Sequence, residues 1–135
     1  MILVDSSALI DYYRPAGLPR VRSAVAKVIE ADLVAINGVI QVEVLAFAGV
    51  ISYRKLRSDF KIFHWLDLRE AEFDLATEMG FSLRRKAITI PATDLIIAAS
   101  AIHADAVLYH VDSHYDTVSQ HCNLKSRNLG TGQSS

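Results

Sequence analysis

Four acidic residues could do chemistry together if the fold brings them to one place: Asp5, Glu43, Asp94 and Asp112. Asp5 and Asp112 each come at or just beyond the end of a short apolar run of the kind that forms buried strands. Asp94 begins an almost wholly apolar helical segment, and Glu43 lies in another that is apolar around most of its circumference. Acids in apolar surroundings are uncommon unless they are paired or bound to a metal. The four residues are therefore candidates for one shared metal site.

Such a cluster would need a cation. Four carboxylates within about 6 Å of one another repel by roughly 3 kcal/mol per pair at an effective dielectric constant of about 20. No lysine or arginine stands close to any of the four in the sequence. Hard oxygen ligands select Mg²⁺ or Mn²⁺, and Mg²⁺ keeps water ligands while also binding phosphate oxygens. The pattern predicts Mg²⁺-dependent phosphoryl chemistry, with Mn²⁺ as the alternative ion.

The four acids would have different roles in that chemistry. A bound cation lowers the pKa of a water molecule and offsets the charge that develops on the phosphate. We expect Asp5 and Asp94 to be the primary ligands. Glu43 and Asp112 would orient waters or hold a second ion, because one carboxylate must accept the proton of the attacking water. The sequence leaves a one-ion site and a two-ion site equally open.

Each acid also has a purely structural interpretation. Asp5 and Asp94 suit a helix cap or a first helical turn, and Asp112 suits a turn. Glu43 is harder to explain in this way, because apolar residues surround it in the sequence. Other phosphoryl motifs fit less well. Ser7 stands where a haloacid-dehalogenase-type phosphatase needs a second aspartate, and the chain has no P-loop.

The segments that would position the acids alternate between short apolar runs and helical patterns. Strands are predicted at residues 2–4, 33–36, 64–68 and 107–109, with an edge strand at 123–126. Helices are predicted at residues 8–13, 21–31, 39–48, 53–63, 70–87 and 94–104, with a short helix from Tyr115. Because parallel strands need long crossover connections, this alternation predicts an α/β fold with a parallel sheet covered by helices. Ligands bind beyond the carboxyl ends of the strands in such sheets.

Length and composition predict one globular domain at residues 1–129, followed by a disordered tail at 130–135. The 135-residue chain is 51% hydrophobic, yet no stretch approaches the roughly 18 apolar residues of a membrane span. A single cysteine, Cys122, fits a reducing compartment, and no export signal is predicted. We therefore expect a cytoplasmic protein with no membrane partner.

The charge balance is unusual for a protein that binds nucleic acid. The net charge is -1, from 14 basic and 15 acidic residues, and a basic excess is typical of nucleic-acid binders. If the four candidate ligands are set aside, 14 basic residues face 11 acidic ones. Two groups of basic residues are candidates for phosphate contacts: Arg54, Lys55, Arg57 and Lys61, and Arg84, Arg85 and Lys86. A solvated helix face is the alternative interpretation of both groups.

A family resemblance rests on segments that occur in a fixed order: Val4-Asp5-Ser6-Ser7-Ala8-Leu9-Ile10, then Glu43, then Thr93-Asp94-Leu95-Ile96-Ile97-Ala98-Ala99, then Asp112. This set resembles the PIN-domain nucleases over nearly the whole chain, and most closely the VapC toxins of toxin-antitoxin pairs. The resemblance implies a three-layer α/β/α sandwich with a mostly parallel sheet and Mg²⁺-dependent cleavage of RNA, with tRNA or rRNA as the substrate. It further implies a homodimer and a VapB-type antitoxin. The four acids would be the catalytic quartet, and Ser7 would support the first aspartate.

The sequence departs from the family pattern after the fourth predicted strand. The family commonly has Thr-x-Asp-x-Asp-Phe there, whereas this chain has His110-Val111-Asp112-Ser113-His114-Tyr115, so a second acid is missing. We interpret His110 and His114 as surface histidines rather than as residues that modify the site. Asp116 is not expected to compensate for the missing acid.

The altered segment keeps two other functions open. One is a PIN-like binding module that has lost catalysis and acts only through a protein partner. The other is a DNA-directed nuclease, because carboxylates and metal recognise phosphate but not the sugar. For an antitoxin helix, an apolar groove is predicted, although core packing is the alternative for its residues: Leu9, Ile10, Tyr12, Tyr13, Ile51, Tyr53 and Leu56.

Overall fold

The sheet at the centre of the molecule has parallel strands and one short antiparallel strand at its edge. The computed structural model describes residues 1–131 and 133–134. The strand order is β3-β2-β1-β4-β5-β6, and only the pairing of β5 with β6 is antiparallel. The strands are β1 Ile2–Val4, β2 Val34–Ile36, β3 His64–Trp65, β4 Val107–His110, β5 Ser126–Asn128 and β6 Gln133–Ser134. The predicted mostly parallel sheet is confirmed.

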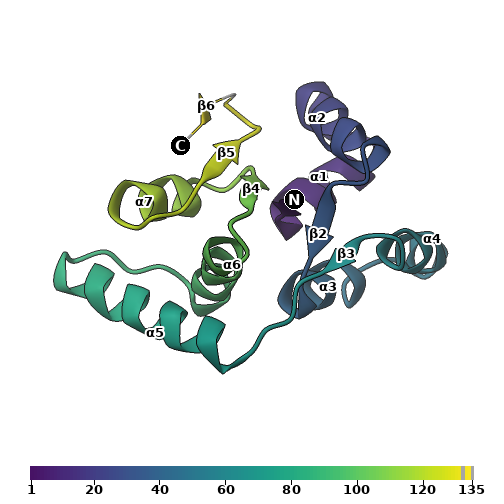
Figure 1. Ribbon diagram of the computed structural model, residues 1–135. Helices are drawn as coiled ribbons and strands as arrows, with labels where there is room; N and C mark the ends of the chain where they lie inside the picture. Colours follow the sequence, from purple (N-terminus) through teal and green to yellow (C-terminus); the bar gives the residue numbers. More distant parts are fainter. Residues whose placement is uncertain (132, 135) are drawn as a thin grey trace.

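Helices lie on both sides of this sheet and complete the three layers of an α/β/α sandwich. Figure 1 shows α1 and α2 on one side of the central strands and α5 and α6 on the other. The helices are α1 Ser6–Tyr13, α2 Pro19–Glu30, α3 Gly38–Leu45, α4 Val50–Phe60, α5 Glu70–Arg85, α6 Ala92–His103 and α7 Ser113–His121. None of the helices in the described part of the chain is both long and apolar enough to cross a membrane.

β1 is the central strand and determines which distant segments meet. Ile2 pairs with Val34 of β2 on one side and with Val107 of β4 on the other. Leu3 and Val4 are fully buried, as expected of a parallel strand that is covered by helices on both faces. Because β1 and β4 are parallel neighbours, the residues that follow them emerge at the same edge of the sheet.

The last parallel strand lies further along the chain than predicted. β5 spans Ser126–Asn128 rather than 123–126. Leu124, an apolar residue within the predicted range, is buried but precedes the strand. Ser126 and Asn128 are buried polar residues. A strand of polar residues is not identified by hydropathy, because the hydrogen bonds between strands are made by backbone groups.

Part of the segment predicted to be a disordered tail forms a strand. Gln133–Ser134 is β6, and Gln133 pairs with Asn128 of β5. Residues 132 and 135 of this segment lie outside the described residues.

A buried carboxylate joins the start of α5 to the end of α6. Glu72 Oε1 accepts a hydrogen bond from the backbone N–H of Arg69 at 3.0 Å, and Glu72 Oε2 lies 2.7 Å from Nδ1 of His103. These hydrogen bonds lower the pKa of Glu72 from its ordinary value of 4.5, and the hydrogen bond with His103 has the larger effect. The pair anchors the far end of the helix whose first turn carries Asp94.

We predict that Glu72→Gln destabilises the fold in a pH-dependent way. A carboxylate with a lowered folded-state pKa contributes stability above its unfolded pKa, and that stability is lost as the pH falls through the folded pKa. At about pH 6 the variant should lose about 1–3 kcal/mol of unfolding free energy, and the difference from wild type should shrink towards about pH 3. Urea unfolding across this range measures both effects.

Glu78→Gln is the matched control, because Glu78 is an exposed residue of the same helix. Its effect should stay within about 0.5 kcal/mol at every pH. A loss for Glu72→Gln that is independent of pH would contradict the assignment to the ionised carboxylate.

A candidate metal centre at the carboxyl edge of the sheet

The four predicted acids come from four different elements at one end of the sheet. Asp5 directly follows β1, and its backbone N–H bonds to the carbonyl oxygen of Tyr109 in β4 at 2.9 Å. Asp112 follows β4 and caps α7, while Asp94 lies in the first turn of α6. Glu43 lies in α3. Because the strands β1–β5 are parallel, they all end at the same edge of the sheet, and the helices that follow them begin there.

Asp5 is buried, and both oxygens of its carboxylate are bonded. Its exposed fraction is 3%. Oδ2 accepts from the backbone N–H of Ser7 at 3.0 Å and from the Ser7 hydroxyl at 2.5 Å. Ser7 Oγ in turn accepts from the N–H of Val111 at 3.2 Å. Ser7 therefore holds Asp5 against the segment that carries Asp112, and Asp5 is the N-cap of α1, as its structural interpretation predicted.

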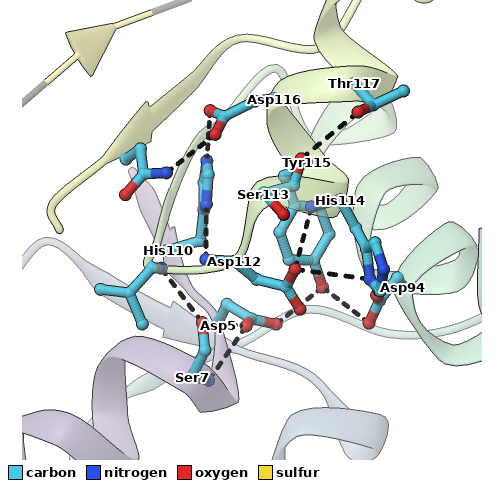
Figure 2. A network of polar contacts seen from close by, with 12 residues as sticks. Asp5, Ser7, Asp94, His110, Asp112, Ser113, His114, Tyr115, Asp116 and Thr117 are labelled. Atoms are coloured by element: carbon cyan, nitrogen blue, oxygen red, sulfur yellow. Dashed lines mark hydrogen bonds and ion pairs between the residues drawn. The ribbon is translucent and has the colours of Figure 1, made fainter. Parts of the chain in front are cut away.

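The hydroxyl of Tyr115 lies between two of the acids. It donates to Asp5 Oδ1 at 2.8 Å and makes a longer contact of 3.4 Å with Asp94 Oδ1 (Figure 2). Burial and the neighbouring carboxylates raise the pKa of Tyr115, so the hydroxyl keeps its hydrogen. Asp5 and Asp94 therefore share one small space. Tyr115 was not predicted as a site residue. The sequence signal that could have identified it is the tyrosine at the position where the family pattern has Phe.

Glu43 belongs to the same electrostatic cluster. Its Oε1 accepts from the hydroxyl of Ser6 at 2.8 Å, a contact between α1 and α3 that no sequence pattern indicated. Burial raises the pKa of Glu43, the Ser6 hydrogen bond opposes that rise, and the charges of Asp5, Asp94 and Asp112 add to it. All four acids are thus close enough to influence one another.

His114 lies between Asp94 and Asp112. Its Nδ1 is 2.8 Å from Asp94 Oδ2 and 3.4 Å from Asp112 Oδ1 (Figure 2). The backbone N–H of His114 also donates to Asp112 Oδ1 at 2.9 Å. Burial raises the pKa of Asp94, and the hydrogen bond from His114 partly opposes this rise. The same hydrogen bond raises the pKa of His114.

The interpretation of His110 as a surface residue is wrong, whereas His114 is half-exposed. His110 is completely buried, and its Nδ1 accepts from the backbone N–H of Asp112 at 3.2 Å. Burial lowers the pKa of His110, which favours the neutral ring. His114 is half-exposed but contacts two of the acids. Leu108 and His110 lie two positions apart in β4 and are both buried, so the alternation of a strand was the signal for the burial of His110.

Asp116 does not replace the missing acid. Its Oδ2 accepts from the side-chain amide of Asn128 at 2.8 Å, and its Oδ1 lies 3.8 Å from His110 Nε2. These contacts direct Asp116 towards β5 rather than towards Asp94, as expected from the sequence.

The residues of this cluster fit a divalent cation. One ligand atom from each of Asp94, Asp112 and His114 lies within 4.8 Å of the others. Within the described residues, no lysine or arginine forms an ion pair with any of the four acids. Burial raises the pKa values of Glu43 and Asp94, and the charges of the neighbouring acids add to the rise. Such a site is suited to oxygen-preferring ions that retain water ligands.

A groove of about 630 Å³ opens beside Glu43, and we call it the α1–α4 groove. Ile10, Tyr13, Ile51 and Leu56 line it, as predicted for an apolar groove. Of the remaining predicted residues, Leu9 is fully buried in the core, and Tyr12 and Tyr53 are not in the lining. Phe47, Lys55 and Arg14 also line the groove, and Arg14 was not predicted.

The predicted phosphate-contacting residues are all exposed but differ in their position. Lys55 faces the α1–α4 groove with Glu43, although it also lies 3.7 Å from Asp59. Arg57 and Lys61 line a separate hollow, and the guanidinium of Arg85 lies over an aromatic ring of its own helix. For Arg54, Arg84 and Lys86 the structure records no contact with the acidic cluster. Of these residues, Lys55 is the one that lines the same groove as Glu43.

Solved structures with similar folds are known. FitAcB from Neisseria gonorrhoeae has a TM-score of 0.79 at 19% identity, over 96% of this chain and 98% of that one. VapBC2 from Rickettsia felis, bound to a DNA fragment from its promoter, has a TM-score of 0.72 at 18% identity, over 95% and 98%. VapC20 of Mycobacterium tuberculosis, a sarcin-ricin loop cleaving toxin, has a TM-score of 0.59 at 15% identity, over 87% and 94%.

These likenesses confirm the predicted fold. The chain has the three-layer, PIN-like α/β/α architecture of the toxin-antitoxin structures, and the alignments span most of its length. No protein-family model matches the sequence, and no curated protein is significantly similar to it.

We predict that Tyr115→Phe destabilises the metal-free protein by about 1–3 kcal/mol, because Asp5 would remain buried with one donor fewer. Urea unfolding in the presence of a chelator measures the change. Tyr109→Phe is the control, since its hydroxyl accepts a long hydrogen bond from the exposed Arg127. That substitution should change the unfolding free energy by less than about 0.5 kcal/mol. Equal effects of the two substitutions would contradict a special role for the Tyr115 hydroxyl.

Proposed function

We propose that this protein is a metal-dependent endoribonuclease and the toxin of a VapBC-type pair. The observation that carries the proposal is the approach of Asp5 and Asp94 to one hydroxyl, with Asp112 and Glu43 in the same electrostatic cluster. The similarity of fold to FitAcB and VapBC2 supports it independently. Converging carboxylates can bind a divalent cation, and a divalent cation bound in this way is well suited to phosphoryl chemistry.

The proposed catalytic residues divide into ligands and a proton acceptor. Asp5, Asp94 and Asp112 would hold Mg²⁺ or Mn²⁺, which lowers the pKa of bound water and offsets phosphate charge. Glu43 would accept the proton of the attacking water, because burial raises its pKa and so makes its carboxylate a stronger base. Ser7 and Tyr115 would hold Asp5 in position through their hydrogen bonds.

RNA is the proposed substrate, with tRNA or rRNA as its source. The cleavage of the sarcin-ricin loop by the similar toxin VapC20 favours structured RNA. Lys55 and Arg14 lie in the groove that leads to Glu43, where they would contact phosphates on either side of the cleaved bond. Arg54, Arg57, Arg84 and Arg85 are candidates for contacts further along the strand.

The proposed protein partner is a VapB-type antitoxin that binds the α1–α4 groove. The groove is mostly apolar, and Phe47 and Ile51 at its rim are 85% and 96% exposed. An amphipathic helix that lays its apolar face into the groove would cover these side chains and block access to Glu43. A cytoplasmic homodimer is the proposed state of the toxin.

A binding module without catalysis is the second candidate. The contact of His114 with Asp94 favours it, because the imidazole contacts a carboxylate that the metal would use. An RNA cleavage assay separates the two candidates, and parallel assays with DNA of the same sequence test the preference for the 2′-hydroxyl.

We predict that Asp94→Asn reduces cleavage of purified tRNA or rRNA by more than about 100-fold while the fold is retained. The substitution keeps the size of the side chain and removes its charge. Cleavage is measured with Mg²⁺, with Mn²⁺ and with a chelator, and circular dichroism checks the fold. Asp105→Asn is the control, because Asp105 is exposed and pairs with Lys125. Full activity of Asp94→Asn, or activity in the chelator, would refute the proposed mechanism.

We predict that Phe47→Asp weakens antitoxin binding by about 30-fold or more, since a charge at the rim of the groove disfavours an apolar helix face. Isothermal titration with the proposed antitoxin measures the affinity, and circular dichroism checks that the variant is folded. Phe81→Asp is the control, because Phe81 is 63% exposed but lies outside the groove. If both substitutions leave the affinity unchanged, the antitoxin binds elsewhere.

A further inference from the structure

The most unusual feature of the candidate metal centre is a nitrogen donor among its carboxylates. His114 stands where the family pattern has its second acid, and its Nδ1 faces both Asp94 and Asp112. We propose that His114 is a metal ligand and that this centre consequently prefers a first-row transition ion, such as Mn²⁺, over Mg²⁺. The inference rests on the proposed function and specifies which ion its site takes.

The distances around His114 match those between neighbouring ligands of one ion. Two donor atoms at right angles, each about 2.1 Å from a cation, are about 3.0 Å apart. Nδ1 lies 2.8 Å from Asp94 Oδ2 and 3.4 Å from Asp112 Oδ1, on either side of this value. Small rotations of the side chains would therefore bring the three atoms around one ion.

The imidazole is held in this position by its own helix. The N–H of His114 bonds to Asp112 Oδ1, so one of the acids fixes the start of α7. The next residue, Tyr115, is buried with its hydroxyl on Asp5 and near Asp94. The backbone on either side of the His114 side chain is thus anchored to the acids that would share the ion.

Nitrogen ligation changes the preference of a site among ions. Mg²⁺ binds oxygen donors and depends on the negative charge of its ligands, whereas imidazole is a good ligand for transition ions. A histidine in place of an acid removes one negative charge and supplies a nitrogen lone pair. Both changes disfavour Mg²⁺ relative to Mn²⁺.

When His114 coordinates, the Nδ1 proton is released to solvent. In the metal-free molecule, Nδ1 shares a hydrogen with Asp94 Oδ2 across 2.8 Å. A ligating imidazole is neutral and keeps its remaining hydrogen on Nε2. The cation would therefore occupy the place of this hydrogen between the two side chains. The observed contact of His114 with Asp94 is thus compatible with a role of both residues as ligands.

Electron spin resonance of the full chain with Mn²⁺ alone tests the proposal without an activity measurement. Electron spin echo envelope modulation detects a ¹⁴N nucleus directly bonded to Mn²⁺. We expect nitrogen modulation in the wild type and its loss in His114→Asn and His114→Asp. His121→Asn is the matched control, because His121 is exposed on the same helix and should leave the modulation unchanged.

Isothermal titration gives the second readout. We expect the wild type to bind Mn²⁺ at least about tenfold more tightly than Mg²⁺, and His114→Asp to reduce this ratio by about tenfold. Circular dichroism checks that both His114 variants are folded, which is expected because the side chain is 45% exposed.

The possible outcomes separate the inference from the proposed function. Mn²⁺ binding without nitrogen modulation in the wild type would overturn the role of His114, while an all-carboxylate nuclease site would survive. The same conclusion follows if modulation persists in His114→Asn. Failure of both Mn²⁺ and Mg²⁺ to bind would overturn the inference and also the metal dependence of the proposed nuclease.

Discussion

Repulsion among acidic side chains at the carboxyl edge of the sheet is the constraint on which the rest of the site depends. Asp5 is buried, and burial together with like charges raises the pKa values of Glu43 and Asp94. In the absence of a cation, the acids are held by hydroxyl donors, chiefly those of Ser7 and Tyr115. These donors hold the carboxylates in an arrangement that fits the divalent ion of the proposed function.

The first turn of α7 connects most of this cluster. Asp112 caps the helix, His114 contacts two acids, and Tyr115 reaches two acids from inside the core. His110 supports the turn from behind by accepting the N–H of Asp112. This segment is also where the chain departs from the family pattern. The departures therefore alter the chemistry of the site, by adding a nitrogen donor and a hydroxyl, and leave the parallel sheet intact.

The acids could be proposed from the sequence because strand ends and helix starts have local signals. The supporting role of Ser7 came only from the family resemblance. The partners across the site could not be identified from the sequence. Ser6 bonds to Glu43 from a separate helix, and Tyr115 has the periodicity of an ordinary core residue. His110 was misjudged because the predicted strand ended at residue 109, one position before it. The position of β5 was missed because its polar residues are buried through backbone pairing.

The sequence by itself determined the α/β class, the parallel sheet and the acids that stand at its edge. Those properties depend on hydrophobic periodicity, caps and the need for long crossovers, all of which are local along the chain. Only the tertiary structure decided which donors meet the acids, that His110 is buried, and that His114 lies between Asp94 and Asp112. Such contacts depend on the packing of α6 and α7 beside β1 and β4, elements that are distant in sequence, and no local pattern encodes the distances between them.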